Sequence, residues 1–260
     1  MLQDRDDRTR EARRLVPTLR AALARTAVLL ALPALQACCA DAHAQERDSA
    51  VPSLPHHSCP GTVPVAVQAT RAADAGHACE GAARALAFLA HAGLKLPERT
   101  TIDIIDRLPG ELDGRALGCY VRDTHRVLLL SRAAFDATGG WFGQPPDDEL
   151  YRSAAAHEVA HAVVGCNTEG RPLPVPAHEY LAYVVMFATM APPLRERVLT
   201  LFGGRGFSST LQINTIVYIA DPLRFAVDAW HHDRARRDGA AWLRAVVAGD
   251  VVQEFPTDGP

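Results

Sequence analysis

Residues 147–165 read DDELYRSAAAHEVAHAVVG, and this stretch decides the fold that the sequence predicts. Asp147 can cap a helix, and the two acidic residues after it suit the positive end of a helix dipole. Uncharged alanine and valine residues fill most of the remaining positions, so the helix can be buried. We therefore expect a buried helix over 147–164 that ends at Gly165.

The two histidines in this stretch, His157 and His161, are four residues apart and share one face of the predicted helix. Two neutral imidazoles in this arrangement can bind one Zn²⁺ from the same side. Glu158 lies about 100° round the helix, where its carboxylate can act as general base on a zinc-bound water without ligating the metal. The pattern predicts one catalytic zinc per chain. The plainer alternative is two core or surface histidines beside a salt-bridged glutamate.

A catalytic zinc needs a third protein ligand and one open position. The segment His178-Glu-Tyr-Leu-Ala-Tyr183 begins an apolar helix, predicted over 177–191, and seventeen residues separate its Glu179 from His161. That length allows a loop and a helix that returns antiparallel to the first. A carboxylate on an apolar helix is costly unless it is paired or binds a metal, so Glu179 is the predicted third ligand. His178 is the second candidate, and Glu179 could instead only cap the helix or pair locally.

This arrangement resembles the gluzincin branch of the zincin metallopeptidases, in which H-E-x-x-H on one helix is followed by a glutamate ligand on the next. Residues 100–190 also resemble an uncharacterised group of bacterial proteins that combine H-E-V-A-H with a downstream H-E-Y-x-A-Y. The resemblance implies a zincin-like fold, zinc ligation by His157, His161 and Glu179, and a general-base role for Glu158.

The same resemblance implies that an upstream edge strand binds the substrate backbone, and residues 126–131 are the candidate for it. Two departures from the zincin patterns stand out. There is no N-E-x-x-S-D sequence around Glu179, and no H-x-x-G-x-x-H extension follows His161. The chain is thus a divergent member, and a relative's substrate does not carry over to it.

The tetrahedral intermediate of peptide hydrolysis carries an oxyanion, which needs a hydrogen-bond donor besides zinc. Tyr183, one turn after the predicted glutamate ligand, is the first candidate, and Tyr180 is another. His231 or His232 could supply the donor from the last helical region, and Asp228 could orient a zinc-bound histidine. The plainer alternatives are core tyrosines and a solvated aspartate.

Outward from the predicted zinc site, the chain alternates between strand and helix patterns. Residues 100–105 are a predicted strand, and residues 116–121 and 126–131 form a predicted hairpin. Further helices are predicted at 78–92, 194–202, 209–237 with a new cap at Asp221-Pro222, and 240–247. The sequence predicts one α+β, zincin-like domain over 76–255. In it a small mixed or antiparallel sheet packs on the active-site helix, and the C-terminal half is mainly helical.

The N-terminal residues predict export. A polar, arginine-rich lead is followed by the apolar run Thr26–Leu35, which is too short to span a bilayer, and by the cleavage site Ala42-His-Ala44. Residues 1–44 are therefore a predicted signal peptide. The alternatives are a lipoprotein anchored at Cys38 and a buried hydrophobic helix.

Residues 45–75 are predicted to be a flexible start of the mature chain, because their first part is rich in Pro, Ser and His. The pair His56-His57 could bind a metal there, or it could simply belong to a solvated linker.

Removal of residues 1–44 leaves Cys59, Cys79, Cys119 and Cys166. An even number of cysteines in an exported chain favours two disulfides. Three pairings are possible, of which we favour Cys59–Cys79 with Cys119–Cys166.

The charge balance argues against polyanionic partners. Residues 1–44 hold seven basic and five acidic residues, so residues 45–260 hold 20 basic and 25 acidic residues, a net charge of −5. Without a basic stripe, neither nucleic acid nor an anionic membrane surface is an expected partner, and no membrane span is expected.

The sequence predicts a zinc-dependent hydrolase of peptide bonds, periplasmic or secreted, that acts on a peptide or protein substrate. Glu158 would activate a zinc-bound water to attack the scissile carbonyl. One alternative is an exported zinc-binding protein without turnover, acting as an interaction or scaffold domain. Another is a structural domain in which the motif is accidental. The intact Glu158 favours the enzyme, because metal binding alone needs no base.

Overall fold

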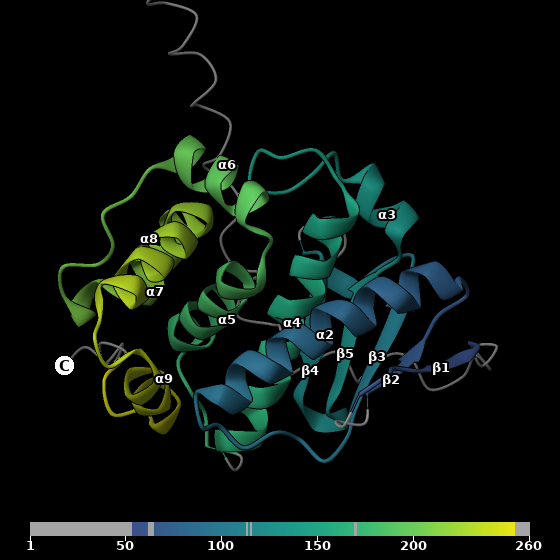
Figure 1. Ribbon diagram of the computed structural model, residues 1–260, viewed down its shortest axis with the longest axis horizontal. Helices are drawn as coiled ribbons and strands as arrows, with labels where there is room; N and C mark the ends of the chain where they lie inside the picture. Colours follow the sequence, from purple (N-terminus) through teal and green to yellow (C-terminus); the bar gives the residue numbers. More distant parts are fainter. Residues whose placement is uncertain (1–53, 62–64, 113, 115, 169–170, 253–260) are drawn as a thin grey trace, which may run out of the picture. The chain divides into compact units, whose positions relative to one another are not determined.

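The computed structural model describes residues 54–252 except 62–64, 113, 115, 169 and 170. The predicted signal peptide lies outside these residues. The described part combines one small mixed sheet with helices, which confirms the predicted α+β class (Figure 1). The strands are β1 His56–Ser58, β2 Val65–Gln68, β3 Thr100–Ile105, β4 Gly118–Val121 and β5 Arg126–Leu130. The longer helices are α2 Ala72–His91, α4 Asp148–Thr168, α5 Val175–Thr189, α6 Pro192–Phe202, α8 Pro222–Ala235 and α9 Gly239–Ala248; the short ones are α3 Arg132–Ala137 and α7 Thr215–Ala220.

The sheet order is β1-β2-β3-β5-β4, with β2, β3 and β5 parallel and the outer strands β1 and β4 antiparallel to their neighbours. The predicted hairpin is confirmed as β4–β5. However, the expectation that residues 126–131 form a substrate-binding edge is wrong. β5 pairs with β3 on one side and with β4 on the other, so its backbone groups are already used. The edge strand that packs against α4 is β4.

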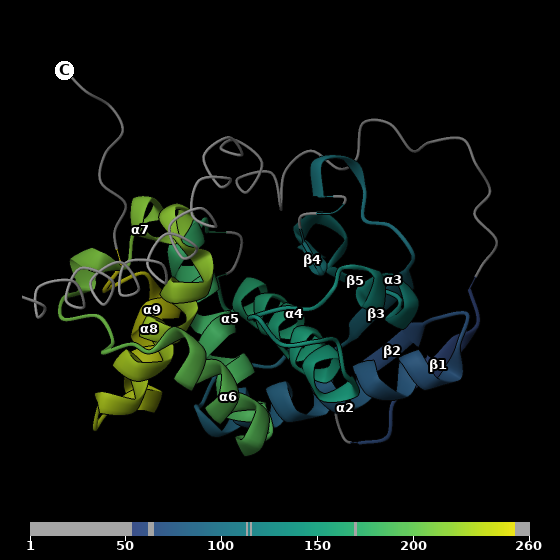
Figure 2. The same ribbon diagram turned by 90° about the horizontal axis from the view of Figure 1, so that it is seen from above.

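Helices α2 and α4 pack side by side and cover one face of the sheet (Figures 1 and 2). Apolar strand residues alternate with period two, so that Tyr120 belongs to the main core shared with α4. Its neighbour Cys119 belongs to a second, smaller cluster with Leu108, Leu112 and Leu130. Helix α5 packs on α4 and continues the core towards α8 and α9. As expected for an apolar helix, residues 180–187 of α5 are all buried.

The residues predicted to be a flexible mature N-terminus are ordered over their described part, which corrects that prediction. They form the antiparallel pair β1–β2 and the start of α2, which begins six residues before the predicted helix. His57 lies in β1 and donates from Nε2 to the carbonyl oxygen of Ala69 at 3.1 Å. Backbone pairing therefore outweighs the Pro-, Ser- and His-rich composition that suggested a linker.

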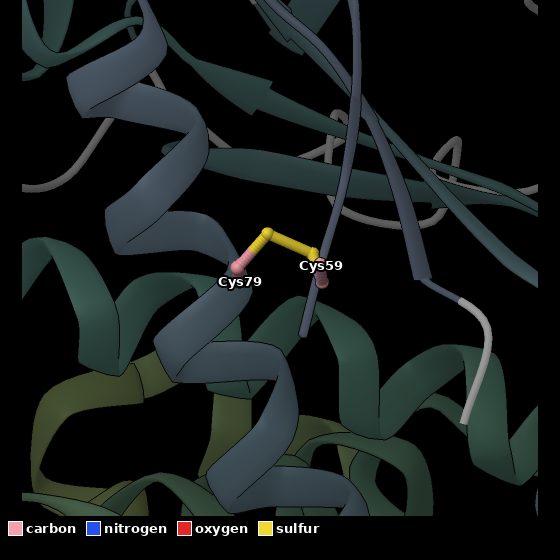
Figure 3. The surroundings of a disulfide bond; sticks show 2 residues. All are labelled: Cys59 and Cys79. Carbon is pink, nitrogen blue, oxygen red and sulfur yellow. A yellow bond between two sulfur atoms is a disulfide. The ribbon is translucent and has the colours of Figure 1, made fainter. Parts of the chain in front are cut away.

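One predicted disulfide is confirmed and the other is wrong. Cys59, just after β1, is bonded to Cys79 on α2 (Figure 3). In the described structure Cys119 and Cys166 are not joined to each other. The reason is the strand alternation: Cys119 belongs to the second cluster, whereas Cys166 sits on α4, which packs on the main core.

Two helix ends differ from the prediction. Helix α4 continues through Gly165 and ends at Thr168. Gly165 does not cap the helix. It lets the Tyr120 side chain come close to the helix backbone, since a Cβ at this position would lie 2.7 Å from the Tyr120 hydroxyl. The long helical region at 209–237 is divided, as the expected new cap indicated. Asp221 accepts a hydrogen bond from the Arg224 amide and begins α8. Within the described ranges, no helix has the length and apolar character needed to cross a bilayer.

Candidate metal centre

Three predicted ligands converge where α4 and α5 pack together. The Nε2 atoms of His157 and His161 are 3.2 Å apart. Glu179, on the first turns of α5, places Oε2 3.6 Å from His157 Nε2 and Oε1 3.5 Å from His161 Nε2. Among the described residues these three form the one group with metal-ligand spacing. His178, the second candidate for third ligand, does not belong to this group.

The separations fit a small tetrahedral ion. Metal–ligand distances of roughly 2.0–2.1 Å and tetrahedral angles place ligand atoms about 3.4 Å apart. Burial lowers the pKa of His157 to about 3. The pKa of His161 is also well below its ordinary value, through burial and then through His157 and His178. Both imidazoles are therefore neutral near pH 7, as metal ligation requires. The Nε2 lone pairs of the two histidines and the Glu179 carboxylate therefore converge on one point between α4 and α5, an arrangement that favours a bound cation.

Aromatic rings hold the first histidine in place. The ring centroid of His157 lies 4.6 Å from that of Tyr183 and 5.9 Å from that of Trp141, which meets it edge to face. Nδ1 of His157 is buried and has no hydrogen-bond partner among the described residues. Ring packing thus orients His157, where many metal sites use a hydrogen bond to Nδ1. Trp141 belongs to the loop between α3 and α4, and nothing in the sequence around it predicted a contact with His157.

Glu158 lies against the edge strand. Its side chain is buried, and a Cβ on Gly118, the first residue of β4, would come 2.5 Å from its Cγ. Only glycine at this point of β4 leaves room for the carboxylate side chain. Glu158 is therefore held between the helix that carries the histidines and the strand that borders the site.

Tyr183 lies beside the candidate metal centre, with its ring against that of His157. Burial raises the pKa of its hydroxyl well above the ordinary value, and the charges of Glu179 and Glu158 raise it further. The hydroxyl therefore stays protonated. Tyr218, on α7, makes a side-chain hydrogen bond to it. Sequence reasoning missed Tyr218, because nothing near it in the chain indicates a partner on α5.

The other candidate donors lie elsewhere, which corrects those expectations. The Tyr180 hydroxyl bonds His232 Nδ1 at 2.7 Å and accepts from Trp242 Nε1 at 3.0 Å. One residue turns a helix by about 100°, so Tyr180 points away from the face that carries Glu179.

Asp228 and His231 belong to a separate loop contact. Asp228 accepts hydrogen bonds from the backbone amides of Arg205 and Gly206, and from the Arg224 side chain. The ring of His231 packs against Gly204 in the same loop. Asp228 therefore anchors the loop before α7 and orients no metal ligand.

Comparison with known proteins places the chain in a family. No curated protein and no solved structure matches it significantly. The model of one family, described as a family of unknown function, matches residues 65–256. The match spans the whole sheet from β2 onwards and every residue of the candidate metal centre. The chain therefore belongs to this family of unknown function, DUF6639.

Proposed function

We propose that this protein is a zinc-dependent hydrolase of peptide bonds with a zincin-like site. The spacing of His157, His161 and Glu179 carries the proposal, because three ligand atoms 3.2–3.6 Å apart match the edges of a zinc tetrahedron. The neighbouring Glu158 adds a base that a purely structural zinc site would not need.

Each residue has a role that follows from its place. Zinc, when bound, supplies a positive charge that makes water more acidic and polarises the scissile carbonyl. Glu158 accepts a proton from the attacking water and returns it to the leaving amine. Tyr183 donates its hydroxyl hydrogen to the oxygen on which negative charge develops. Tyr218 orients the Tyr183 hydroxyl through their hydrogen bond.

The edge strand β4 offers a surface for the substrate backbone. It is the outermost strand of the described sheet on the side of α4, and Gly118 in it contacts Glu158. The outer edge of such a strand can pair with an extended peptide, which brings a scissile bond alongside the base. We therefore propose that β4, and not residues 126–131, binds the substrate backbone.

Export is part of the proposal. The Cys59–Cys79 disulfide is compatible with an oxidising compartment outside the cytoplasm. We propose the periplasm or the extracellular space as the place of action.

The test is metal analysis together with a peptide-library digest of the full-length protein. We expect about one zinc per chain and zinc-dependent cleavage of peptide bonds. The Glu158→Gln variant should keep its zinc and lose hydrolysis, since it retains the shape of the side chain without its basicity. Zinc binding without hydrolysis by the wild type would favour the scaffold alternative. Full activity of Glu158→Gln would refute the mechanism.

A further inference from the structure

The edge strand leads from the proposed base towards the far end of α4. Gly118 adjoins Glu158, and two residues later Tyr120 adjoins Gly165. Gly165 comes seven residues after Glu158 on the helix, so strand and helix advance in the same direction over about 10 Å. Arg122, directly after β4, is therefore carried beyond the metal centre, to where α5 begins.

His178 meets this arginine from the other side. It lies on the first turn of α5, one residue before Glu179, and its ring centroid is 5.9 Å from that of His161. Burial, and then the charge of the Arg122 guanidinium, hold the pKa of His178 down at about 4. The course of β4 and the start of α5 thus bring Arg122 and His178 to the same end of the metal centre, near enough for the guanidinium charge to act on the imidazole.

Neither group has an acceptor within the described part of the chain. Nε2 of His178 is buried and has no hydrogen-bond partner there. No described carboxylate pairs with the Arg122 side chain, which is half-buried. By contrast, Arg126 pairs with Asp103, and Arg132 pairs with Asp148. Buried polar groups are nearly always hydrogen-bonded, so the buried Nε2 of His178, on the same side of the centre as an arginine without a carboxylate partner, indicates a ligand that brings its own acceptors.

We propose that Arg122 and His178 form a carboxylate-binding subsite beside the metal centre. The planar guanidinium can donate two parallel hydrogen bonds to a carboxylate. His178 adds a third donor in the tautomer that carries its proton on Nε2. The first turn of α5 contributes the positive end of a helix dipole.

The subsite defines a substrate class, and in this respect it rests on the proposed function. An extended peptide advances about 3.3 Å per residue, so a carboxylate at Arg122 lies within roughly three residues of the scissile bond. Two sources share this chemistry: the C-terminal carboxylate of the substrate and the side chain of an aspartate or glutamate. The first makes the enzyme an exopeptidase, and the second makes it selective for acidic sequences.

The activity test uses the full-length, zinc-loaded protein and a library of N-acetylated tetrapeptides, each as free acid and as C-terminal amide. We expect peptides that carry a carboxylate to be cleaved preferentially. The Arg122→Gln variant should lower kcat/KM for them by about 10- to 100-fold and so remove their advantage over neutral amides. Arg237→Gln, which changes an exposed arginine after α8, is the matched control. Cleavage of neutral free acids but not of Glu-containing amides identifies the C-terminus as the source, and the reverse identifies the side chain.

A binding measurement separates the two proposals. Calorimetry with N-acetylphenylalanine and N-acetylglutamate amide, against N-acetylphenylalanine amide, should show binding only of the two carboxylates. That binding should be lost in Arg122→Gln and kept in Arg237→Gln, with the zinc content unchanged. Arg122-dependent binding without any hydrolysis supports the subsite and rejects the hydrolase. Zinc-dependent hydrolysis without a preference for carboxylates, or an equal loss on all peptides in Arg122→Gln, overturns the subsite.

Discussion

Glu179 carries a negative charge at the start of a helix whose following residues are buried and apolar. Its carboxylate lies within 3.6 Å of both histidine Nε2 atoms. Because these imidazoles are neutral, they contribute lone pairs and no positive charge, which a cation bound between them and the carboxylate would supply. The sequence could predict this residue for the same reason, since an acidic side chain on an apolar helix needs a partner.

Replacement of Glu179 by alanine should therefore remove the metal. We expect the zinc content to fall from about one per chain to near zero at limiting free zinc, because two histidines bind zinc more weakly than three ligands. Mass spectrometry of dialysed protein measures the content. Glu196→Ala, on the exposed surface of α6, is the matched control. Zinc retained by Glu179→Ala but lost by His178→Ala would make His178 the third ligand.

Removal of the Tyr183 hydroxyl should affect the chemical step and spare the metal. Its raised pKa keeps the hydroxyl protonated, so Tyr183→Phe removes a donor for the developing oxyanion. We expect kcat to fall by about 10²- to 10³-fold, with KM and zinc content nearly unchanged. Tyr180→Phe is the control, because that hydroxyl bonds His232 and Trp242. Equal losses in the two variants would indicate a structural role for both tyrosines.

The sequence could indicate single site residues only where their spacing along one helix fixes their relative positions. His157 and His161 met this condition, and Glu179 with Tyr183 met it on the next helix. Tyr218 and Trp141 approach the centre from α7 and from a loop, so their positions depend on tertiary packing. For the same reason the sequence left Tyr180 as a second candidate donor beside Tyr183.

The pairing of β4 with α4 sets the position of the proposed base. Gly118→Ala would place a methyl group 2.5 Å from Glu158 Cγ and 2.8 Å from the Leu128 carbonyl oxygen. We expect the free energy of unfolding to fall by about 1–3 kcal/mol and hydrolysis to fall because the carboxylate is displaced. Urea unfolding and peptide assays measure the two effects.

A second glycine provides the control for this substitution. Gly76→Ala, inside α2, has nothing within 4 Å of the new methyl group. It should raise the free energy of unfolding by about 0.5–1 kcal/mol and leave hydrolysis unchanged. Unchanged hydrolysis in Gly118→Ala would mean that β4 does not position Glu158.

At the level of elements, local patterns predicted the β4–β5 hairpin and the cap at Asp221, but not the sheet order. A hairpin and a cap depend on residues that are close in sequence, so local sequence patterns are enough to predict them. The insertion of β5 between β3 and β4 depends on a parallel pairing across the intervening chain. The short strand β1 has only three residues, too few for an alternating pattern to reveal it.

In the whole molecule the proposed metal centre lies between two parts of the fold. Helix α4 packs with α2 on the sheet, and α5 packs with the C-terminal helices α8 and α9. The three proposed ligands come from these two helices, so an ion bound by them would link the sheet layer to the helical half. Metal binding should therefore contribute to the stability of the entire domain, since only the folded chain brings the ligands together.

The same burial makes the metal-free protein sensitive to acid. In the unfolded chain a histidine takes up its proton near pH 6.5, whereas the folded chain keeps His157 neutral down to about pH 3 and His178 down to about pH 4. Between these values the unfolded state binds more protons. The contribution of these two histidines to the free energy of unfolding is therefore complete above about pH 6.5. It is lost as the pH falls, by up to about 1.4 kcal/mol per pH unit for each histidine.

Urea unfolding of the zinc-stripped, full-length protein between about pH 7.5 and about pH 4.5 measures this slope. We expect His157→Gln and His178→Gln each to reduce the slope, because each removes one proton from the difference between the two states. His91→Gln, an exposed position at the end of α2, should leave it unchanged. A slope that is identical in all four proteins would show that these imidazoles are protonated in the folded state. In that case they would not be poised to bind a metal at neutral pH, and the proposed centre would lose its main electrostatic support.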